Sequence, residues 1–404
     1  MKIGILSDLH LGHKQYGLME RENDFYKQFQ KCCSKLNELN TDVVIIAGDI
    51  FDKPNPSPFS MHQYIDGIRS LNAEYVIAIK GNHTMLQRKN HYSADRFFFD
   101  NHIQGYYLLE DDSIFIEDKV RIDGITYRPD SQLDDFIEKQ KEIGNVECDD
   151  SIYRILITHQ AYSEFCGFTN VSLSIDDINL SPYDMIINGH IHSHLLQKYQ
   201  ETVFLQPGSI ERLNIAEAID EEENGKGVWL LDVDENNLSF YPIKPERKFF
   251  HGDICIKSKR QLNKVFENSK QQFKNEENKP IVAYNYHDEV GNSQLIRDMI
   301  ISLSEYVLRD NSNIYGQESS EITVEITDSE IPTIVQSLGL VEDLDDDERK
   351  LSIDIYNALK EERQDISNLL ETFRKKKYAH KENKEYIEKT RQEIKEFEEF
   401  FDKL

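Results

Sequence analysis

Five short segments of the sequence carry side chains that bind divalent metals, and an apolar run precedes each segment. They are SDLHLG at 7–12, GDIFD at 48–52, KGNHT at 80–84, THQ at 158–160 and NGHIHSH at 188–194. The candidate ligands are Asp8, His10, Asp49, Asn82, His159, His190 and His192. Imidazole nitrogens together with carboxylate and amide oxygens suit Mn, Fe or Zn better than Ca or Mg alone. These residue types therefore indicate a metal centre, with manganese as the first choice.

None of these segments identifies a metal site by itself. A single His after a strand is more often a hydrogen-bonded structural residue than a ligand, and GNH or GD alone marks little more than a turn. Five such segments together favour one shared site. Seven ligands are too many for one tetrahedral ion but suit two ions that share a carboxylate, about 3.5 to 4 Å apart. We expect two divalent ions.

Residues beside the motifs are weaker candidates. We expect His13 and His194 to face solvent or a loop and not to bind metal. Arg88 and Lys89 follow GNHTMLQ and are candidates for contact with a phosphate backbone, although such pairs are more often solvated charge.

The apolar runs before the five segments predict the strands that must position the ligands. They lie at 2–6, 43–47, 75–79, 155–157 and 185–187, and they alternate with helical patterns as in stacked βα units. The carboxyl ends of strands in an open α/β sheet form the crevice where ligands bind. Groups far apart in sequence are therefore predicted to converge.

Helices are predicted between the strands. Apolar residues recur at helical spacing after the first strand, at Phe25, Phe29, Cys32, Leu36 and Leu39. One face of this crossover helix can pack on the sheet. Ser57 and Pro58 predict the N-cap and first residue of the next helix.

From about residue 112 the pattern changes to paired strands. The segment at 118–130 predicts a hairpin around Asp-Gly, and the segment at 227–245 predicts one around Asp-Glu-Asn-Asn, which together favour a second sheet. Strands at 253–256, 280–286 and 321–326 then alternate with helices at 261–273 and 293–307. This order predicts a separate α+β unit.

The last stretch, from about 331, is densely charged and predicts two helices. In the final helix an apolar seam of coiled-coil type runs through Ile387, Thr390, Ile394, Phe397, Phe401 and Leu404. The seam fits either a helix folded back on its own domain or a helix docked on a partner.

Composition sets the limits of these hypotheses. A chain of 404 residues predicts two or three domains. With 47 basic and 74 acidic residues, its charge of −27 argues against a broad basic face that binds nucleic acid.

The five cysteines show neither zinc-ligand spacing nor an even disulfide set, and the start MKIGILSDLHLG has no apolar signal core. We therefore expect a cytoplasmic protein without a membrane span.

The ordered set DLHLG, GDIFD, GNH, THQ and GHIH resembles the calcineurin-like metallophosphoesterase superfamily. Within it, GDIFD is similar to the SbcD-type DNA double-strand-break repair nucleases. The resemblance implies an α/β fold, a two-sheet αββα metallophosphoesterase sandwich, over 1–246. It also implies an α+β capping domain at 247–330, where ENKPIV looks like that family, and a helical partner-binding segment at 331–404.

The resemblance assigns roles to the candidate ligands. One metal ion would be held by Asp8, His10 and His192, the other by Asn82, His159 and His190, with Asp49 bridging both. The His of GNH is catalytic and not a ligand in the family, so the resemblance assigns this role to His83. An unperturbed imidazole pKa of about 6.5 suits proton donation to a leaving oxygen, or stabilisation of negative charge on the phosphoryl group. Thr84 replaces the acid that often follows GNH in the family, and Asp52 is the hypothetical substitute that orients His83.

The function implied by the resemblance is a two-metal, Mn-dependent phosphodiester hydrolase acting on DNA. The family members that this chain resembles act as 3′-to-5′ exonucleases on double strands and as endonucleases on single strands. The resemblance also implies a complex with an SMC-type (SbcC-like) coiled-coil ATPase for DNA end processing, repair or recombination. A homodimer within a heterotetramer is implied in the same way.

Two alternatives stay open at this point. A small phosphodiester, a cyclic nucleotide or a phosphoprotein as substrate is favoured by the acidic charge and disfavoured by the additional domains. A non-enzymatic scaffold with a vestigial site is disfavoured by the complete ligand set.

Overall fold

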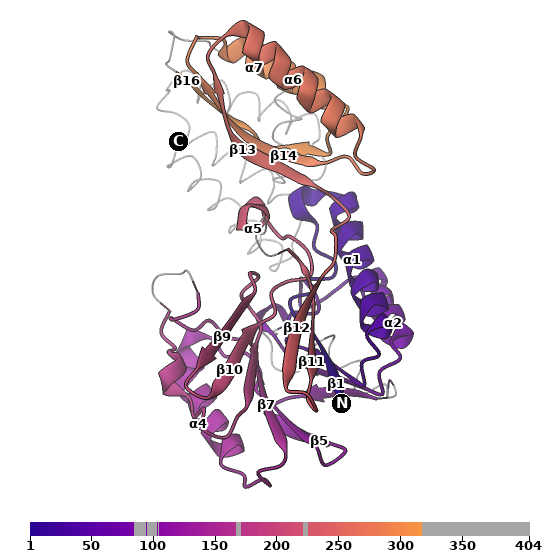
Figure 1. Cartoon of the computed structure of the whole chain (residues 1–404), viewed down its shortest axis with the longest axis vertical. Coiled ribbons are helices and arrows are strands. Elements are labelled where there is room, and N and C mark those ends of the chain that lie inside the picture. The colour runs from indigo at the N-terminus through magenta and orange to yellow at the C-terminus, as the bar shows by residue number, and fades with distance from the viewer. Residues whose placement is uncertain (85–93, 95–102, 104, 167–170, 221–224, 317–404) are drawn as a thin grey trace, which may run out of the picture. The chain divides into compact units, whose positions relative to one another are not determined.

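The computed structural model describes residues 1–84, 94, 103, 105–166, 171–220 and 225–316. The chain divides after Gln317, and the described residues all belong to the first unit. The described part contains two six-stranded sheets and a smaller third sheet (Figure 1). Among these residues no helix combines the length and the apolar character needed to cross a bilayer.

The first sheet carries the earliest strands of the chain. Its order is β12-β11-β1-β2-β3-β4, with β1 at Lys2–Leu6, β2 at Val43–Ile46, β3 at Tyr75–Ile79, β4 at Tyr106–Leu109, β11 at Gly227–Asp232 and β12 at Asn237–Pro242. β1 to β4 are parallel, whereas β11 runs antiparallel to β1. The predicted crossover helix is α1 (Met19–Glu38), which buries Phe25, Phe29, Cys32 and Leu36. α2 (Pro58–Ser70) begins as predicted, because the Ser57 hydroxyl accepts a hydrogen bond from the Ser60 amide at 3.0 Å.

The second sheet has the order β5-β6-β7-β8-β10-β9. Its strands are β5 (Asp112–Ile116), β6 (Val120–Gly124), β7 (Tyr153–Thr158), β8 (Met185–Asn188), β9 (Leu195–Tyr199) and β10 (Thr202–Gln206). The four strands β6, β7, β8 and β10 are parallel. Helix α4 (Leu133–Gly144) packs on this sheet through the buried Phe136.

The two sheets pack face to face. Alternating residues of β1, such as Ile3 and Ile5, share one fully buried cluster with Ile155 and Ile157 of β7. The opposite face of the first sheet packs with α1 and α2 in a second cluster, and the opposite face of the second sheet packs with α4 in a third. The expected two-sheet αββα sandwich is confirmed.

The third sheet belongs to the part predicted as a separate α+β unit. It pairs β13 (Phe249–Ile256) with β14 (Ile281–Asp288), and β14 with β15 (Arg309–Asp310) and β16 (Asn313–Gly316), all in parallel. Helices α6 (Lys259–Lys274) and α7 (Ser293–Leu303) share a hydrophobic core with it. The strand expected at 321–326, the tail helices and the pair Arg88 and Lys89 lie outside the described residues.

One predicted hairpin has its turn in a different place. Asp123 and Gly124 lie inside β6 and not in a turn, because the Asp123 carboxylate is buried against Arg121 at 2.7 Å. The turn lies at residues 117–119, where Glu117 and Asp118 both have positive φ. The hairpin of β11 and β12 forms as predicted but joins the first sheet.

Candidate active site

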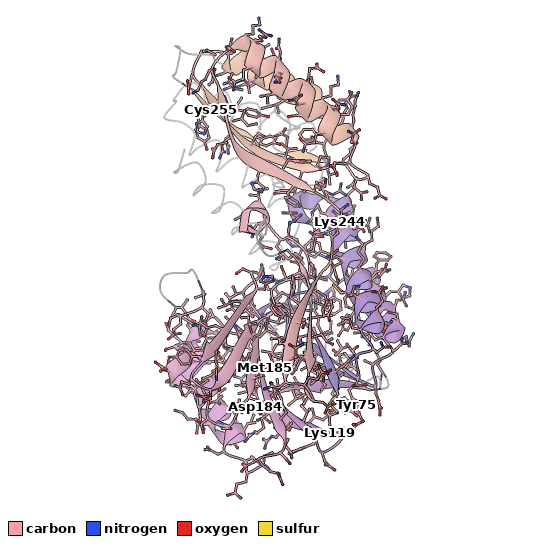
Figure 2. The ribbon with its side chains drawn as sticks, viewed as in Figure 1. Tyr75, Lys119, Asp184, Met185, Lys244 and Cys255 are labelled. Atoms are coloured by element: carbon pink, nitrogen blue, oxygen red, sulfur yellow. The ribbon has the colours of Figure 1, made fainter. Side chains whose placement is uncertain are left out.

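The five predicted motifs meet at one end of the sandwich, although their strands belong to different sheets. β1, β2 and β3 lead into the motifs of the first sheet, and β7 and β8 lead into those of the second. Figure 2 shows the opposite end of two of these strands, where Tyr75 begins β3 and Met185 begins β8 at the bottom of the view. The site therefore lies between the carboxyl ends of two facing sheets.

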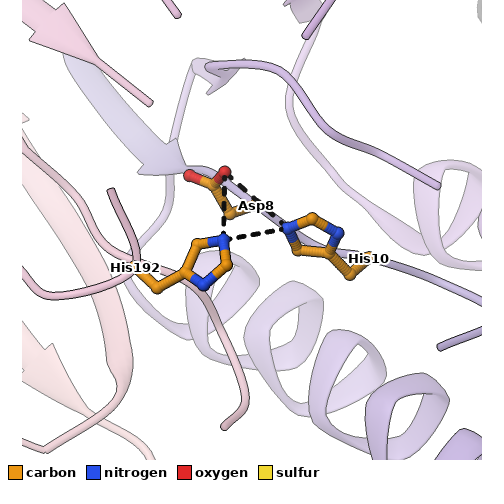
Figure 3. Close-up of side chains that lie close together, drawn as sticks. All are labelled: Asp8, His10 and His192. Atoms are coloured by element: carbon orange, nitrogen blue, oxygen red, sulfur yellow. Dashed lines mark hydrogen bonds and ion pairs between the residues drawn. The ribbon is translucent and has the colours of Figure 1, made fainter. Parts of the chain in front are cut away.

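Asp8, His10 and His192 form one cluster, here called the first half-site (Figure 3). The Nε2 atoms of His10 and His192 are 3.2 Å apart. Oδ1 of Asp8 lies 3.9 Å from Nε2 of His10 and 4.0 Å from Nε2 of His192. Three ligand atoms thus face a common point.

Asn82, His159 and His190 form the second half-site. The Oδ1 atom of Asn82 lies 3.1 Å from Nε2 of His159 and 2.9 Å from Nδ1 of His190. Asn82 belongs to the short 3-10 helix η2 (Asn82–Thr84), while the two histidines follow β7 and β8. One residue from the first sheet therefore meets two from the second.

Asp49 lies between the two half-sites. Its Oδ2 atom is 3.2 Å from Nε2 of His159 and 3.9 Å from Nε2 of His10. Its Oδ1 atom accepts a hydrogen bond of 2.9 Å from the backbone amide of His83. One carboxylate thus contacts both half-sites and the loop that carries His83.

Burial and charge set the protonation of the cluster. Burial lowers the pKa of His190 to about 3, and it lowers the pKa of His10 well below its usual value. Burial would also lower the pKa of His159, but the charge and hydrogen bond of Asp49 raise it to about 9. His10 and His190 therefore offer neutral nitrogens, and a cation beside Asp49 would displace the His159 proton.

Glycines of the motifs make room for His159. Gly48 has φ +93°, and a Cβ there would lie 2.2 Å from Nδ1 of His159. A Cβ on Gly189 would lie 2.0 Å from the carbonyl oxygen of Ala47. That carbonyl accepts a hydrogen bond from Nδ1 of His159 at 2.8 Å, which leaves Nε2 facing Asp49. The backbone itself therefore fixes the ring of His159.

His192 is fixed by a side chain that lies in none of the five motifs. Its Nδ1 donates to Oε1 of Glu217 at 3.0 Å. Burial would raise the pKa of Glu217, but His192 and Lys226 lower it to about 2. The sequence prediction missed Glu217, which follows His192 by 25 residues and carries no signal that relates it to the five motifs.

His83 is held by backbone groups. Its Nδ1 donates to the carbonyl oxygen of Asp52 at 2.7 Å, and its Nε2 lies 4.0 Å from Oδ2 of Asp49. The expectation that the Asp52 carboxylate orients His83 is wrong, because that carboxylate contacts Nδ1 of His13 at 2.7 Å. Thr84 closes the loop by donating its hydroxyl to the carbonyl of Gly81 at 3.0 Å.

Other aromatic side chains surround the cluster. His194 packs edge-on against Trp229 and Phe240 and is not part of a metal-binding group among the described residues. Tyr127 follows β6 and places its ring 5.8 Å from that of His190, at an angle of 37°. Tyr127 therefore forms a wall of the second half-site.

The residues present fit two divalent cations. The nitrogen and oxygen atoms of the two half-sites lie on either side of Asp49, and such a donor set suits Mn, Fe or Zn. The backbone is strained at the same place: Asp8, His10, Asp49 and His190 all have positive φ. Strained residues of this kind cluster at active sites and also occur in tight turns, such as the turn at Glu117 and Asp118.

Comparison with known proteins adds independent information. Residues 1–236 match the model of the calcineurin-like phosphoesterase superfamily domain. The chain is 29% identical over 310 residues to the DNA double-strand break repair protein Mre11 of Methanococcus maripaludis. The aligned region covers 74% of this chain and 81% of the relative. It is 26% identical over 339 residues to the protein of the same name from Methanocaldococcus jannaschii, with 79% and 88% covered. It is also 25% identical over 280 residues to a subunit of the nuclease SbcCD from Staphylococcus epidermidis, with 61% and 71% covered.

Proposed function

The chain belongs to the calcineurin-like phosphoesterase superfamily, and from this premise we propose that it hydrolyses phosphodiester bonds of DNA with two divalent metal ions. The single observation that carries the proposal is the pair of half-sites that share Asp49. The names of the relatives, a DNA double-strand break repair protein and part of a nuclease, support DNA as the substrate.

The proposed ligand assignment follows the geometry. Asp8, His10 and His192 would hold one ion, Asn82, His159 and His190 would hold the other, and Asp49 would be shared by both. Manganese is the proposed metal, because a mixed set of imidazoles, carboxylates and an amide oxygen suits it. When bound, two such cations lower the pKa of a water molecule and neutralise charge on the phosphoryl group.

His83 is the proposed catalytic side chain. A proton on Nδ1 is committed to the Asp52 carbonyl, so only Nε2 is available to exchange a proton with substrate. The ring is about one-third exposed, at 36%, and it stands edge-on to His10 with ring centroids 4.7 Å apart. His83 is therefore placed to give a proton to the leaving oxygen.

The remaining parts of the proposal concern the whole chain. We infer a nuclease domain at 1–246, a capping domain at 247–330 and a partner-binding segment at 331–404. The proposed partner is an SMC-type, SbcC-like coiled-coil ATPase, within a heterotetramer that contains a homodimer of this chain. The proposed activities are 3′-to-5′ exonuclease on double strands and endonuclease on single strands.

A direct assay tests the proposal. The purified chain is incubated with end-labelled double-stranded and single-stranded DNA in Mn²⁺, in Mg²⁺ and in chelator, with and without the ATPase. Cleavage that requires Mn²⁺ and is lost in chelator is expected. Intact DNA in every arm contradicts the proposal.

Hydrolysis of bis-p-nitrophenyl phosphate in the same preparation, without cleavage of DNA, would instead favour a small phosphodiester as substrate. The charge of −27 is the observation that supports this second candidate, because it disfavours contact with a polyanion.

A further inference from the structure

Glu217 contacts a proposed metal ligand without belonging to the ligand set. It lies in α5 (Ile215–Asp220), and 8% of its surface is exposed. Its Oε1 atom accepts the Nδ1 proton of His192 at 3.0 Å. An imidazole that carries its proton on Nδ1 has its lone pair on Nε2, the atom that faces Asp8 and His10.

The carboxylate of Glu217 is fixed independently of His192. Oε1 also accepts a hydrogen bond from the side-chain Nδ2 of Asn214 at 2.9 Å, and Oε2 accepts one from the backbone amide of Leu213 at 3.1 Å. The backbone amide of Glu217 in turn donates to Oδ1 of Asn214 at 3.0 Å. The acceptor is therefore in place before the ring of His192 meets it.

Lys226 links this carboxylate to the backbone of His192. Its ammonium group donates to Oε2 of Glu217 at 3.3 Å, to the carbonyl oxygen of His192 at 2.9 Å and to the hydroxyl of Ser209 at 2.8 Å. Only 4% of Lys226 is exposed. One buried ion pair thus contacts both the ring and the main chain of His192.

We propose that Glu217 is a positioning residue for His192, that Lys226 holds Glu217 in place, and that this pair sets the affinity of the first half-site for its cation. The inference rests on the proposed function, because it assumes that the half-site binds a metal ion. The second half-site has no such side chain on His159, whose Nδ1 donates to the Ala47 carbonyl.

Binding of Mn²⁺ to the full-length chain tests the inference without reference to catalysis. Isothermal titration resolves the two binding steps for wild type and Glu217→Gln. Glu201→Gln serves as the control, because Glu201 is an exposed glutamate that pairs with Lys198. We expect Glu217→Gln to weaken one site by about 10- to 100-fold and to leave the other unchanged. Glu201→Gln should match wild type.

A second background separates positioning from general stability. In a His192→Ala chain, adding Glu217→Gln should cause no further loss of Mn²⁺ affinity, because the residue acts through His192. Glu217→Asp, which keeps the charge beside Lys226 but shortens the reach, should weaken the same site to a lesser extent. If Glu217→Gln does not fold, Mn²⁺ binding to Glu217→Asp still tests the inference.

Three results would overturn the inference: wild-type affinity in both Glu217 variants, equal weakening of both sites, or a further loss in the His192→Ala background. Failure of the proposed function gives a different result. A wild-type chain that binds two Mn²⁺ ions but leaves DNA intact contradicts the function and leaves the role of Glu217 standing.

Discussion

The two half-sites on either side of Asp49 offer similar ligand atoms but are held in place by different means. His192 in the first half-site depends on a side-chain network of Glu217 and Lys226. His159 in the second half-site is fixed by the carbonyl of Ala47. The position of His192 is therefore open to adjustment by substitution of a side-chain partner, whereas the hydrogen bond that fixes His159 comes from the backbone.

The half-sites also differ in exposure. The side chain of His192 is 26% exposed, while that of His159 is completely buried. A more exposed ligand gains more from a fixed partner, because its unbound ring has more freedom to lose. This difference gives a physical reason for a positioning carboxylate on one side only.

Replacement of Asp49 should have the largest effect, because its carboxylate contacts both half-sites. In Asp49→Asn the side chain keeps its size but loses its negative charge. Mn²⁺ binding at both half-sites should weaken, and DNA hydrolysis should fall by more than the ~100-fold typical of residues that only support ligands. Titration with Mn²⁺ and a cleavage assay measure both quantities. Retention of two tightly bound ions would show that Asp49 does not join the half-sites.

Replacement of His83 should separate chemistry from metal binding. His83→Gln removes the proposed proton donor, so kcat should fall by about 10²- to 10⁴-fold. Both half-sites should bind Mn²⁺ as in wild type, because none of their ligands is changed. Full activity together with normal metal content would exclude His83 from the reaction.

Gly48→Ala should damage the second half-site selectively. The added Cβ would lie 2.2 Å from Nδ1 of His159, in a residue with φ +93°. Overpacking of this kind costs about 1–3 kcal/mol, and the displaced ring should bind its cation less tightly. Chemical denaturation measures the free energy of unfolding, and Mn²⁺ titration measures the affinity.

Gly17→Ala is the matched control for Gly48→Ala. Gly17 has φ +71°, and no atom of the described residues lies within 4 Å of an added Cβ, so this variant shows the backbone strain without the contact. If Gly48→Ala and Gly17→Ala lower the free energy of unfolding equally and bind Mn²⁺ with the same affinity, the contact between Gly48 and His159 does not fix the second half-site.

Asp52→Asn should have the smallest effect of the four. The backbone carbonyl of Asp52, and not its carboxylate, holds His83, and the carboxylate lies 3.9 Å from Nδ1 of His10. Turnover of DNA should stay within about 10-fold of wild type, the lower end of the range for supporting residues. A loss as large as that of His83→Gln would mean that the Asp52 carboxylate takes part in the reaction.

The sequence predicted the parts of the site that depend on residue type. A strand followed by Asp, Asn or His has a clear signal, and six of the seven ligand candidates lie in the two half-sites, with Asp49 between them. The sequence did not reveal the hydrogen bonds that use the carbonyls of Ala47 and Asp52, because every residue carries a carbonyl. Glu217 was missed since no periodic pattern relates it to His192.

The sheet architecture shows the same limit. The paired strands after residue 112 favoured a second sheet, but the αββα sandwich was expected through the family resemblance, since local patterns do not tell that β7 and β8 belong to a different sheet from β1. The Asp-Gly pair at 123 and 124 favoured a turn by residue type. The buried partners Arg121 and Tyr183 keep Asp123 inside β6 instead, and only the folded chain brings Tyr183 close to Asp123.

Anomalous diffraction from crystals grown with Mn²⁺ tests most directly whether the two half-sites hold a pair of cations. Two peaks should flank the Asp49 carboxylate about 3.5 to 4 Å apart, one beside His10 and His192 and the other beside Asn82 and His190. A single peak, or peaks away from Asp49, would contradict a two-metal centre.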